Sequence, residues 1–191
     1  KWLRDLCGGG FHFGELSAEA RDVPPGSDGL ITLPYFAGER SPLLDPDARG
    51  VMLGLTLNHG RGHMYRSLLE ATAFGVEHIF EGMRAAGVST DRGFAVGGGT
   101  TGGLWPQIVS DVTGMTQQIT EQSVGACYGD AMFAGVGIGL VSENTDWTTH
   151  SGVIEPTPGA REIYRPFYQA YRELHPATVD LQHRMAQVQR G

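Results

Sequence analysis

The sequence predicts an α/β fold, because strand-like and helix-like segments alternate around a glycine-rich loop. The loop runs from Gly97 to Gly103 and holds five glycines in seven residues. It follows the short apolar segment 94–96 and precedes residues 104–113, whose apolar side chains recur at helical spacing. Glycine lets backbone N–H groups approach an anion closely, and the N-terminus of a helix favours negative charge. This order of strand, loop and helix predicts a cradle for a phosphate or a nucleotide.

Periodicity and turn residues predict the elements on either side of the loop. A short helix opens the chain and ends at the glycines 8–10, and residues 30–33 form a short buried strand. Residues 63–86 carry apolar side chains every three or four positions and are followed by Gly87, which predicts a long helix. Residues 116–120 are predicted to form the strand that follows the glycine loop and its helix.

Two further helices are expected in the C-terminal part of the chain. Residues 125–140 are rich in glycine and alanine, so this helix can pack with its backbone close to a neighbour. Aromatic and apolar side chains from Tyr164 to Leu174 mark a last amphipathic helix. We expect that helix to be interrupted or bent near Pro176, because proline removes a backbone donor.

Composition restricts the class of protein. A chain of 191 residues fits one domain, and its net charge of −7 disfavours a general nucleic-acid or anionic-membrane surface. Two cysteines, Cys7 and Cys127, are too few for a disulfide framework, and neither a signal peptide nor a membrane-length apolar run is found. We therefore expect a cytoplasmic protein. The chain begins inside a helical pattern without a methionine, so we expect a fragment.

Other interpretations of the glycines and histidines stay open. Gly97, Gly99 and Gly102 have the spacing of a dinucleotide-binding loop, and Glu121 follows where a ribose-binding acid would lie. The glycines would also suit close packing of helix against strand. His59 and His63 are four residues apart, but the glycines between them disfavour a helical metal site, so a role in a loop and a helix cap is expected.

Three segments together resemble the C-terminal half of the FGGY carbohydrate kinases. Residues 29–42, which include Leu-Pro-Tyr and Gly-Glu-Arg-Ser-Pro, resemble one family segment, and residues 50–70 resemble the family's C-terminal signature. Residues 97–114, with Trp105, resemble the nucleotide loop and its helix. The Gly-Glu-Arg-Ser-Pro sequence resembles that of xylulokinase-like and other pentulose kinases more than that of glycerol kinases.

The resemblance implies an actin-like ATPase (ribonuclease-H-like) domain, the C-terminal lobe of a two-lobed sugar kinase. Residues 1–191 would be the C-terminal FGGY domain, and the sugar-binding N-terminal domain would lie outside the chain. The implied activity is ATP-dependent phosphorylation of a sugar such as the pentulose xylulose, with ATP and Mg²⁺ as cofactors. The implied partners are the sugar, ATP and the N-terminal domain, with a homodimer left open and no nucleic acid or membrane expected.

The resemblance also assigns nucleotide-binding residues, whereas the catalytic aspartate is expected outside this chain and no metal ligand is expected within it. Backbone groups of two glycines would meet the adenosine side of ATP, two more glycines would leave room for base or ribose, a threonine would add a hydroxyl, and a lysine would contact adenine. In that order these residues are Gly98 and Gly99, Gly102 and Gly103, Thr100, and Lys1. Thr100 and Gly102 stand where the family usually has Ala and Ser.

Two expectations follow from this assignment. A valine at position 99 is expected to raise the KM for ATP at least tenfold, and the isolated chain is expected to be inactive. A dinucleotide-binding oxidoreductase module and a non-catalytic actin-like module remain the alternative functions. Which sugar is phosphorylated is not readable from these residues.

Overall fold

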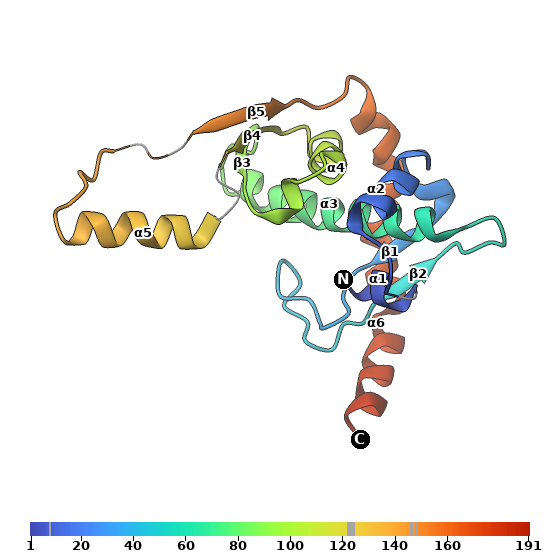
Figure 1. Cartoon of the computed structure of the whole chain (residues 1–191). Helices are drawn as coiled ribbons and strands as arrows, with labels where there is room; N and C mark the ends of the chain where they lie inside the picture. Colours follow the sequence, from blue (N-terminus) through green and yellow to red (C-terminus); the bar gives the residue numbers. More distant parts are fainter. Residues whose placement is uncertain (8, 122–124, 146, 148) are drawn as a thin grey trace.

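The computed structural model describes residues 1–7, 9–121, 125–145, 147 and 149–191. Helices and strands alternate along the chain, as predicted for an α/β domain (Figure 1). In chain order they are α1 (Trp2–Leu6), α2 (Phe13–Arg21), the 3₁₀ turn η1 (Ser27–Gly29), β1 (Ile31–Leu33), β2 (Val51–Leu53), α3 (Arg61–Ala85), β3 (Arg92–Ala95), the 3₁₀ turn η2 (Gly98–Thr100), α4 (Leu104–Thr113), β4 (Thr116–Thr120), α5 (Gly125–Gly137), β5 (His150–Ile154) and α6 (Ala160–Arg190).

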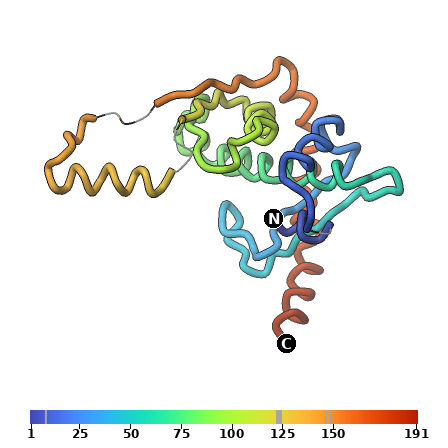
Figure 2. Tube along the Cα trace, viewed as in Figure 1, coloured from blue at the N-terminus to red at the C-terminus, as the bar shows by residue number. Residues whose placement is uncertain are grey.

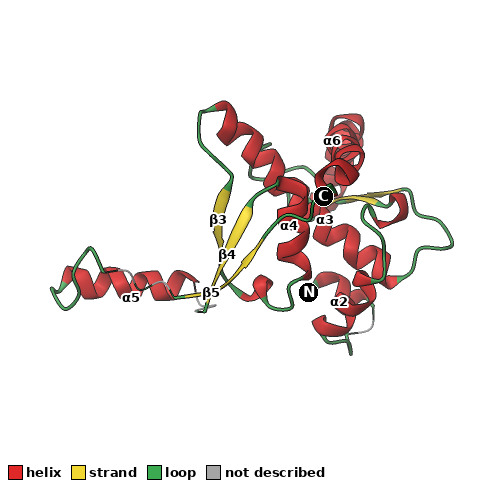
Figure 3. Cartoon of the chain, turned by 90° about the horizontal axis from the view of Figure 1, so that it is seen from above, coloured by secondary structure: helices red, strands yellow, loops and turns green. Residues whose placement is uncertain are grey.

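The sheet that carries the glycine loop has the strand order β3-β4-β5. β3 pairs with β4 in parallel, and β5 adds to the other side of β4 in the antiparallel direction. Figure 3 shows the three strands side by side with α4 next to them. The connection from β3 to β4 passes through the glycine loop and α4, so the loop lies at the carboxyl end of β3. Ligands of open α/β sheets bind at this edge.

α3 is the central helix of the domain. It packs against α2, α4 and α6, and it lies across the middle of the molecule in Figure 1. Phe74 of α3 meets Tyr164 and Tyr171 of α6 in the core, and the Phe74 and Tyr171 ring centroids are 5.5 Å apart. The predicted helix 63–86 is confirmed as α3, but its apolar spacing does not mark the buried face, because Glu70 and Glu77 are buried beside Phe74.

A buried ion pair on α3 is hydrogen-bonded to both α2 and α6. Arg66 is 6% exposed and Glu70 is 2% exposed, and Arg66 Nε donates to Glu70 Oε1 at 2.8 Å. The remaining guanidinium nitrogens of Arg66 donate to the Ala20 carbonyl of α2 at 3.1 Å and to the Tyr164 hydroxyl of α6 at 2.8 Å. Glu70 also accepts the Gly26 N–H at 2.9 Å. These bonds fix the C-terminal end of α2 against α3.

α6 continues past Pro176, so it is not interrupted there, and the alternative of a bend at Pro176 stays a prediction. The helix runs unbroken from Ala160 to Arg190 and contains two prolines. Proline in a helix costs about 3 kcal/mol, and contacts on the far side of Pro176 offset that cost. Gln182 is buried there and accepts the Arg49 N–H at 2.8 Å, while Arg190 pairs with Asp47. Tertiary contacts therefore decide the length of this helix.

α5 forms as predicted but does not pack closely against a neighbouring helix. None of its described residues is buried, and Phe133 is 76% exposed. Figures 1 and 2 show α5 extending away from the body of the domain, at the left of each view. Its small residues permit close packing but cannot supply a partner. Among the helices that the structure describes, α5 included, none has the length and apolarity needed to cross a membrane.

Acid is expected to destabilise this fold through two half-buried histidines. Burial, aided by the charge of Arg172, lowers the pKa of His78 below 6.5, and burial likewise lowers the pKa of His175. For both histidines the folded-state pKa lies below the unfolded value. Their contribution to the free energy of unfolding is therefore fully present above about pH 6.5 and is lost as the pH falls through the folded-state pKa. Urea unfolding should therefore give a lower free energy at about pH 5 than at about pH 7.5.

The variant His78→Leu should reduce this pH dependence, because it removes one of the two titrating rings. His12→Gln is the matched control, since His12 is exposed. Equal pH dependence in both variants would contradict the assignment to the buried ring.

Candidate functional site

A hollow of about 600 Å³ lies between the glycine loop and the helices α2 and α3. Its volume falls within the range of small-molecule sites, and its wall is mainly apolar, as in most such sites. The lining residues are Phe13, Gly14, Ser17 and Arg21 of α2, Tyr65 and Leu69 of α3, and Gly98, Gly99, Thr101, Gly102, Leu104 and Trp105 of the loop and α4. The glycine loop therefore forms one wall of a cavity, with aromatic side chains on both sides.

The loop has a conformation that depends on glycine. Gly97, Gly102 and Gly103 have φ angles of +93°, +92° and +74°, a region that other residues rarely adopt. α4 begins directly afterwards at Leu104, so the N-terminus of this helix lies beside the hollow. Its first turn has few free donors, because the Leu104 N–H donates to the Gly102 carbonyl at 2.9 Å and Pro106 has no N–H. Thr100 turns back on the loop, because its hydroxyl donates to the Gly97 carbonyl at 2.8 Å. Its oxygen remains able to accept a hydrogen bond.

Gly98 and Gly99 lie in different surroundings although both line the hollow. A Cβ at Gly98 would meet no atom within 4 Å, whereas a Cβ at Gly99 would lie 2.2 Å from the Trp105 ring. That ring is held in place, since Trp105 Nε1 donates to the Thr72 hydroxyl at 2.8 Å. Gly99 is thus required for packing beneath Trp105. A valine at 99 would disturb the ring as well as any ligand, so position 98 gives the cleaner test.

The α2 wall was missed by the sequence interpretation. Leu16 and Ala20 have no exposed surface and lie four residues apart, and the Glu15 carboxylate accepts the His12 N–H at 2.8 Å at the start of the helix. This acidic residue at the third helical position, with two apolar residues at helical spacing, is the signal that could have found α2. At the other end of α2, the Arg21 guanidinium donates to the Gly102 carbonyl.

The structure brings together most of the predicted site residues. Gly98, Gly99 and Gly102 line the hollow, and Thr100 and Gly103 belong to the same loop without lining it. Lys1 is exposed at the start of α1 and is not among the lining residues. α1 does reach the entrance of α2, because Arg4 lies 4.9 Å from the centroid of the Phe13 ring. The adenine contact of Lys1 stays a prediction.

His59 and His63 have the expected role in a loop and a helix cap. His63 Nδ1 accepts the Gly60 N–H at 3.2 Å at the start of α3, and His59 Nδ1 accepts the Thr56 N–H at 2.9 Å. The ring nitrogens are thus used to close the loop before α3.

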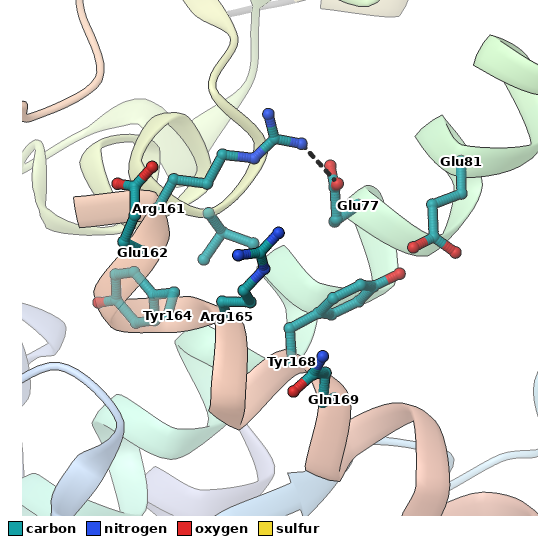
Figure 4. A pocket seen from close by; sticks show the side chains of 9 residues that line it. Glu77, Glu81, Arg161, Glu162, Tyr164, Arg165, Tyr168 and Gln169 are labelled. Carbon is teal, nitrogen blue, oxygen red and sulfur yellow. Dashed lines mark hydrogen bonds and ion pairs between the residues drawn. The ribbon is translucent and has the colours of Figure 1, made fainter. Parts of the chain in front are cut away.

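A second hollow of about 450 Å³ lies between the other half of α3 and the start of α6 (Figure 4). Glu77 Oε1 accepts from Arg161 at 3.1 Å and from Arg84 at 2.7 Å. Three glutamates and two arginines line this hollow: Glu77, Glu81, Glu162, Arg161 and Arg165. Because its carboxylates outnumber its cations, this hollow suits a polyanionic nucleotide less well than the hollow at the glycine loop.

Comparison with known proteins identifies the family to which this chain belongs. The model for the C-terminal domain of the FGGY family of carbohydrate kinases matches residues 5–138, which is more than half of the chain. The chain belongs to the FGGY family of carbohydrate kinases. The matched segment contains the glycine loop, α2 and α3, and therefore every residue that lines the hollow.

Individual FGGY kinases show the same relationship. The chain is 32% identical over 170 residues to a ribulokinase of Bacillus licheniformis, covering 84% of this chain and 31% of the relative. It is 28% identical over 185 residues to a xylulose kinase of Bacillus subtilis, covering 94% of this chain and 37% of the relative. The chain thus spans about a third of the length of these relatives.

Solved structures give the same fold. The crystal structure of xylulose kinase from Rhodospirillum rubrum superimposes with a TM-score of 0.81 at 33% identity, covering 95% of this chain and 37% of that one. FGGY kinases have the actin-like ATPase fold, so that expectation is confirmed. The comparisons give no support for a dinucleotide-binding oxidoreductase.

Proposed function

We propose that this chain is the nucleotide-binding lobe of a kinase that transfers the terminal phosphoryl group of ATP to a hydroxyl of a pentulose such as xylulose. The observation that carries the proposal is the hollow bounded by the glycine loop in a member of the FGGY family. The names of its relatives, ribulokinase and xylulose kinase, support a pentulose as the acceptor.

The hollow offers what the adenosine part of ATP needs. Phe13, Tyr65 and Trp105 supply aromatic surface for a purine, and Gly98 leaves its backbone open on the loop side. The N-terminus of α4 adds partial positive charge close to Gly103. We assign nucleotide contacts to Gly98, Gly99, Thr100, Gly102 and Gly103 on this basis, with Lys1 as a further candidate.

The reaction needs more than this lobe. Phosphoryl transfer depends on Mg²⁺, which neutralises charge on the phosphates, and on a base that accepts the proton of the sugar hydroxyl. In the part of the chain that the structure describes, no three His, Cys, Asp or Glu side chains gather as a metal site. We propose that Mg²⁺ is held chiefly by the nucleotide phosphates and that the catalytic aspartate belongs to a second lobe.

The second lobe is the partner that we propose for this chain. The exposed apolar side chains of α5, such as Phe133, Ile138 and Leu140 just beyond its end, suit a protein surface better than water. A homodimer is the other arrangement that such a surface permits. Cys7 and Cys127 are both free, which agrees with a reaction in the reducing cytoplasm.

A substrate panel on the protein that carries this chain tests the proposal. ADP release from ATP should depend on an added pentulose, with xylulose and ribulose compared against glycerol and gluconate, and the 191-residue chain alone should give none. Tighter binding of NAD than of ATP would restore the oxidoreductase interpretation. Binding of ATP without release of ADP for any sugar would favour a non-catalytic module.

A further inference from the structure

Arg21 occupies a special place in the wall of the nucleotide hollow. Among the described residues that line the hollow, it is the only one with a charged side chain. It is the last residue of α2, and its Nη2 donates across the hollow to the Gly102 carbonyl. That carbonyl also accepts the Leu104 N–H at 2.9 Å, where the loop turns into α4. Arg21 therefore joins one wall of the hollow to the other.

The base from which Arg21 projects is rigid. The neighbouring Ala20 has no exposed surface, and its carbonyl accepts from the buried Arg66 at 3.1 Å. Arg66 is in turn paired with Glu70 inside the domain. The chain segment that carries Arg21 is thus fixed to α3 by a charged hydrogen bond, which is stronger than one between neutral groups.

The loop end that Arg21 holds has few other contacts. A Cβ built at Gly97, Gly102 or Gly103 would meet no atom within 4 Å, so the space on that side of each glycine is open. All three glycines have positive φ, and glycine gives the backbone more conformational freedom than any other residue. Without a tether, this end of the loop would sample several positions relative to α2.

We propose that Arg21 is a positioning residue that holds the Gly102–Gly103 end of the loop at the distance from α2 that fits the nucleotide. The proposal rests on the proposed function, since it concerns the same hollow. Binding of a nucleotide to an untethered loop would have to order that loop first, and this ordering lowers affinity. Arg21 acts through the loop backbone, so adenosine and ATP should depend on it equally.

The test compares Arg21→Met, Arg21→Lys and a control in the protein that carries this chain. Arg21→Met keeps the apolar stem and removes the hydrogen bond, and it should raise the Kd for ATP and for adenosine about fivefold each, which equals roughly 1 kcal/mol. The value of kcat and the KM for the sugar should change less than about twofold, because the reacting groups are untouched. Arg21→Lys should recover most of the affinity, since an ammonium group can also donate to a carbonyl.

Arg184→Met is the matched control. Arg184 is exposed near the C-terminal end of α6, and no partner for its side chain is seen in the described residues. Arg184→Met removes the same charge from the chain as Arg21→Met, but outside the hollow. The Kd for ATP and the Kd for adenosine should therefore both stay unchanged. Calorimetric titration gives the two affinities, and a thermal melt checks that each variant is folded.

The possible outcomes distinguish a failure of the proposed function from a failure of the proposed role of Arg21. If the unchanged protein fails to bind ATP, the proposed function is wrong. If it binds ATP but Arg21→Met binds equally well, the tether is wrong and the proposed function stands. If Arg21→Met weakens ATP but leaves adenosine unchanged, Arg21 contacts the phosphates directly and the positioning role is overturned.

Discussion

Replacing Arg66 with methionine is expected to lower the free energy of unfolding by about 3–5 kcal/mol, because the change leaves a buried carboxylate without its counter-charge. Glu70 is 2% exposed, so water cannot take the place of the guanidinium. The same substitution removes the donors to the Ala20 carbonyl and to the Tyr164 hydroxyl. Burial raises the pKa of Tyr164, so this hydroxyl keeps its proton and donates to Glu70 at 3.2 Å. Urea unfolding at neutral pH measures the loss.

Arg61→Met on the same helix is the matched control. Arg61 pairs with Glu19 through a bidentate contact that is open to solvent, and exposed pairs contribute little to stability because water screens their charges. Equal losses of unfolding free energy for Arg61→Met and Arg66→Met would show that burial of the Arg66–Glu70 pair does not increase its contribution to stability. If Arg66→Met does not fold, Arg66→Lys supplies a milder change, because lysine keeps the charge but cannot reach all three acceptors.

Arg66 also connects the core to the nucleotide site. It holds the Ala20 carbonyl, and the next residue is Arg21, whose guanidinium bonds to the glycine loop. A folded Arg66 variant should therefore lose affinity for ATP in addition to stability. A loss of stability with unchanged affinity for ATP would show that the buried pair does not influence the glycine loop.

The elements that could be predicted from the sequence are those with local signals. α4 lies between the glycines of the loop and Gly114, whose φ of +75° ends the helix as its position suggested. β4 covers residues 116–120 as predicted. In these segments the hydrophobic spacing and the glycines that end the helix agree, so the prediction needed no knowledge of the tertiary structure.

The features that could not be predicted depend on contacts between distant segments. α6 passes through Pro176 because Gln182 and Arg190 find partners in the loop before β2, more than 130 residues away. The same limit applies to Gly99. Its neighbour Trp105 is only six residues away, but the ring position is set by Thr72 on α3. A glycine-rich loop in a sequence therefore does not reveal which glycine serves a ligand and which serves packing.

Gly98→Val is expected to raise the KM for ATP at least tenfold, about 1.4 kcal/mol, while the KM for the sugar changes little. Gly98 lies in the first position of η2 on the wall of the hollow, and its φ is outside the positive region. A side chain there meets no protein atom within 4 Å of its Cβ, so the fold can accept it. If the nucleotide approaches the loop backbone at this point, the new methyl groups occupy its space.

Two matched variants decide whether the effect comes from the ligand. Gly152→Val places the same side chain on β5, also with no atom within 4 Å of its Cβ and away from the hollow, so both the KM for ATP and the Tm should stay unchanged. Gly99→Val should raise the KM for ATP and also lower the Tm, because its Cβ would overlap the Trp105 ring. An unchanged KM for ATP in Gly98→Val, with a normal Tm, would mean that the nucleotide does not touch this part of the loop. The open backbone at Gly98 would then have no part in binding, and the assignment of the hollow would have to rest on its α2 and α3 walls.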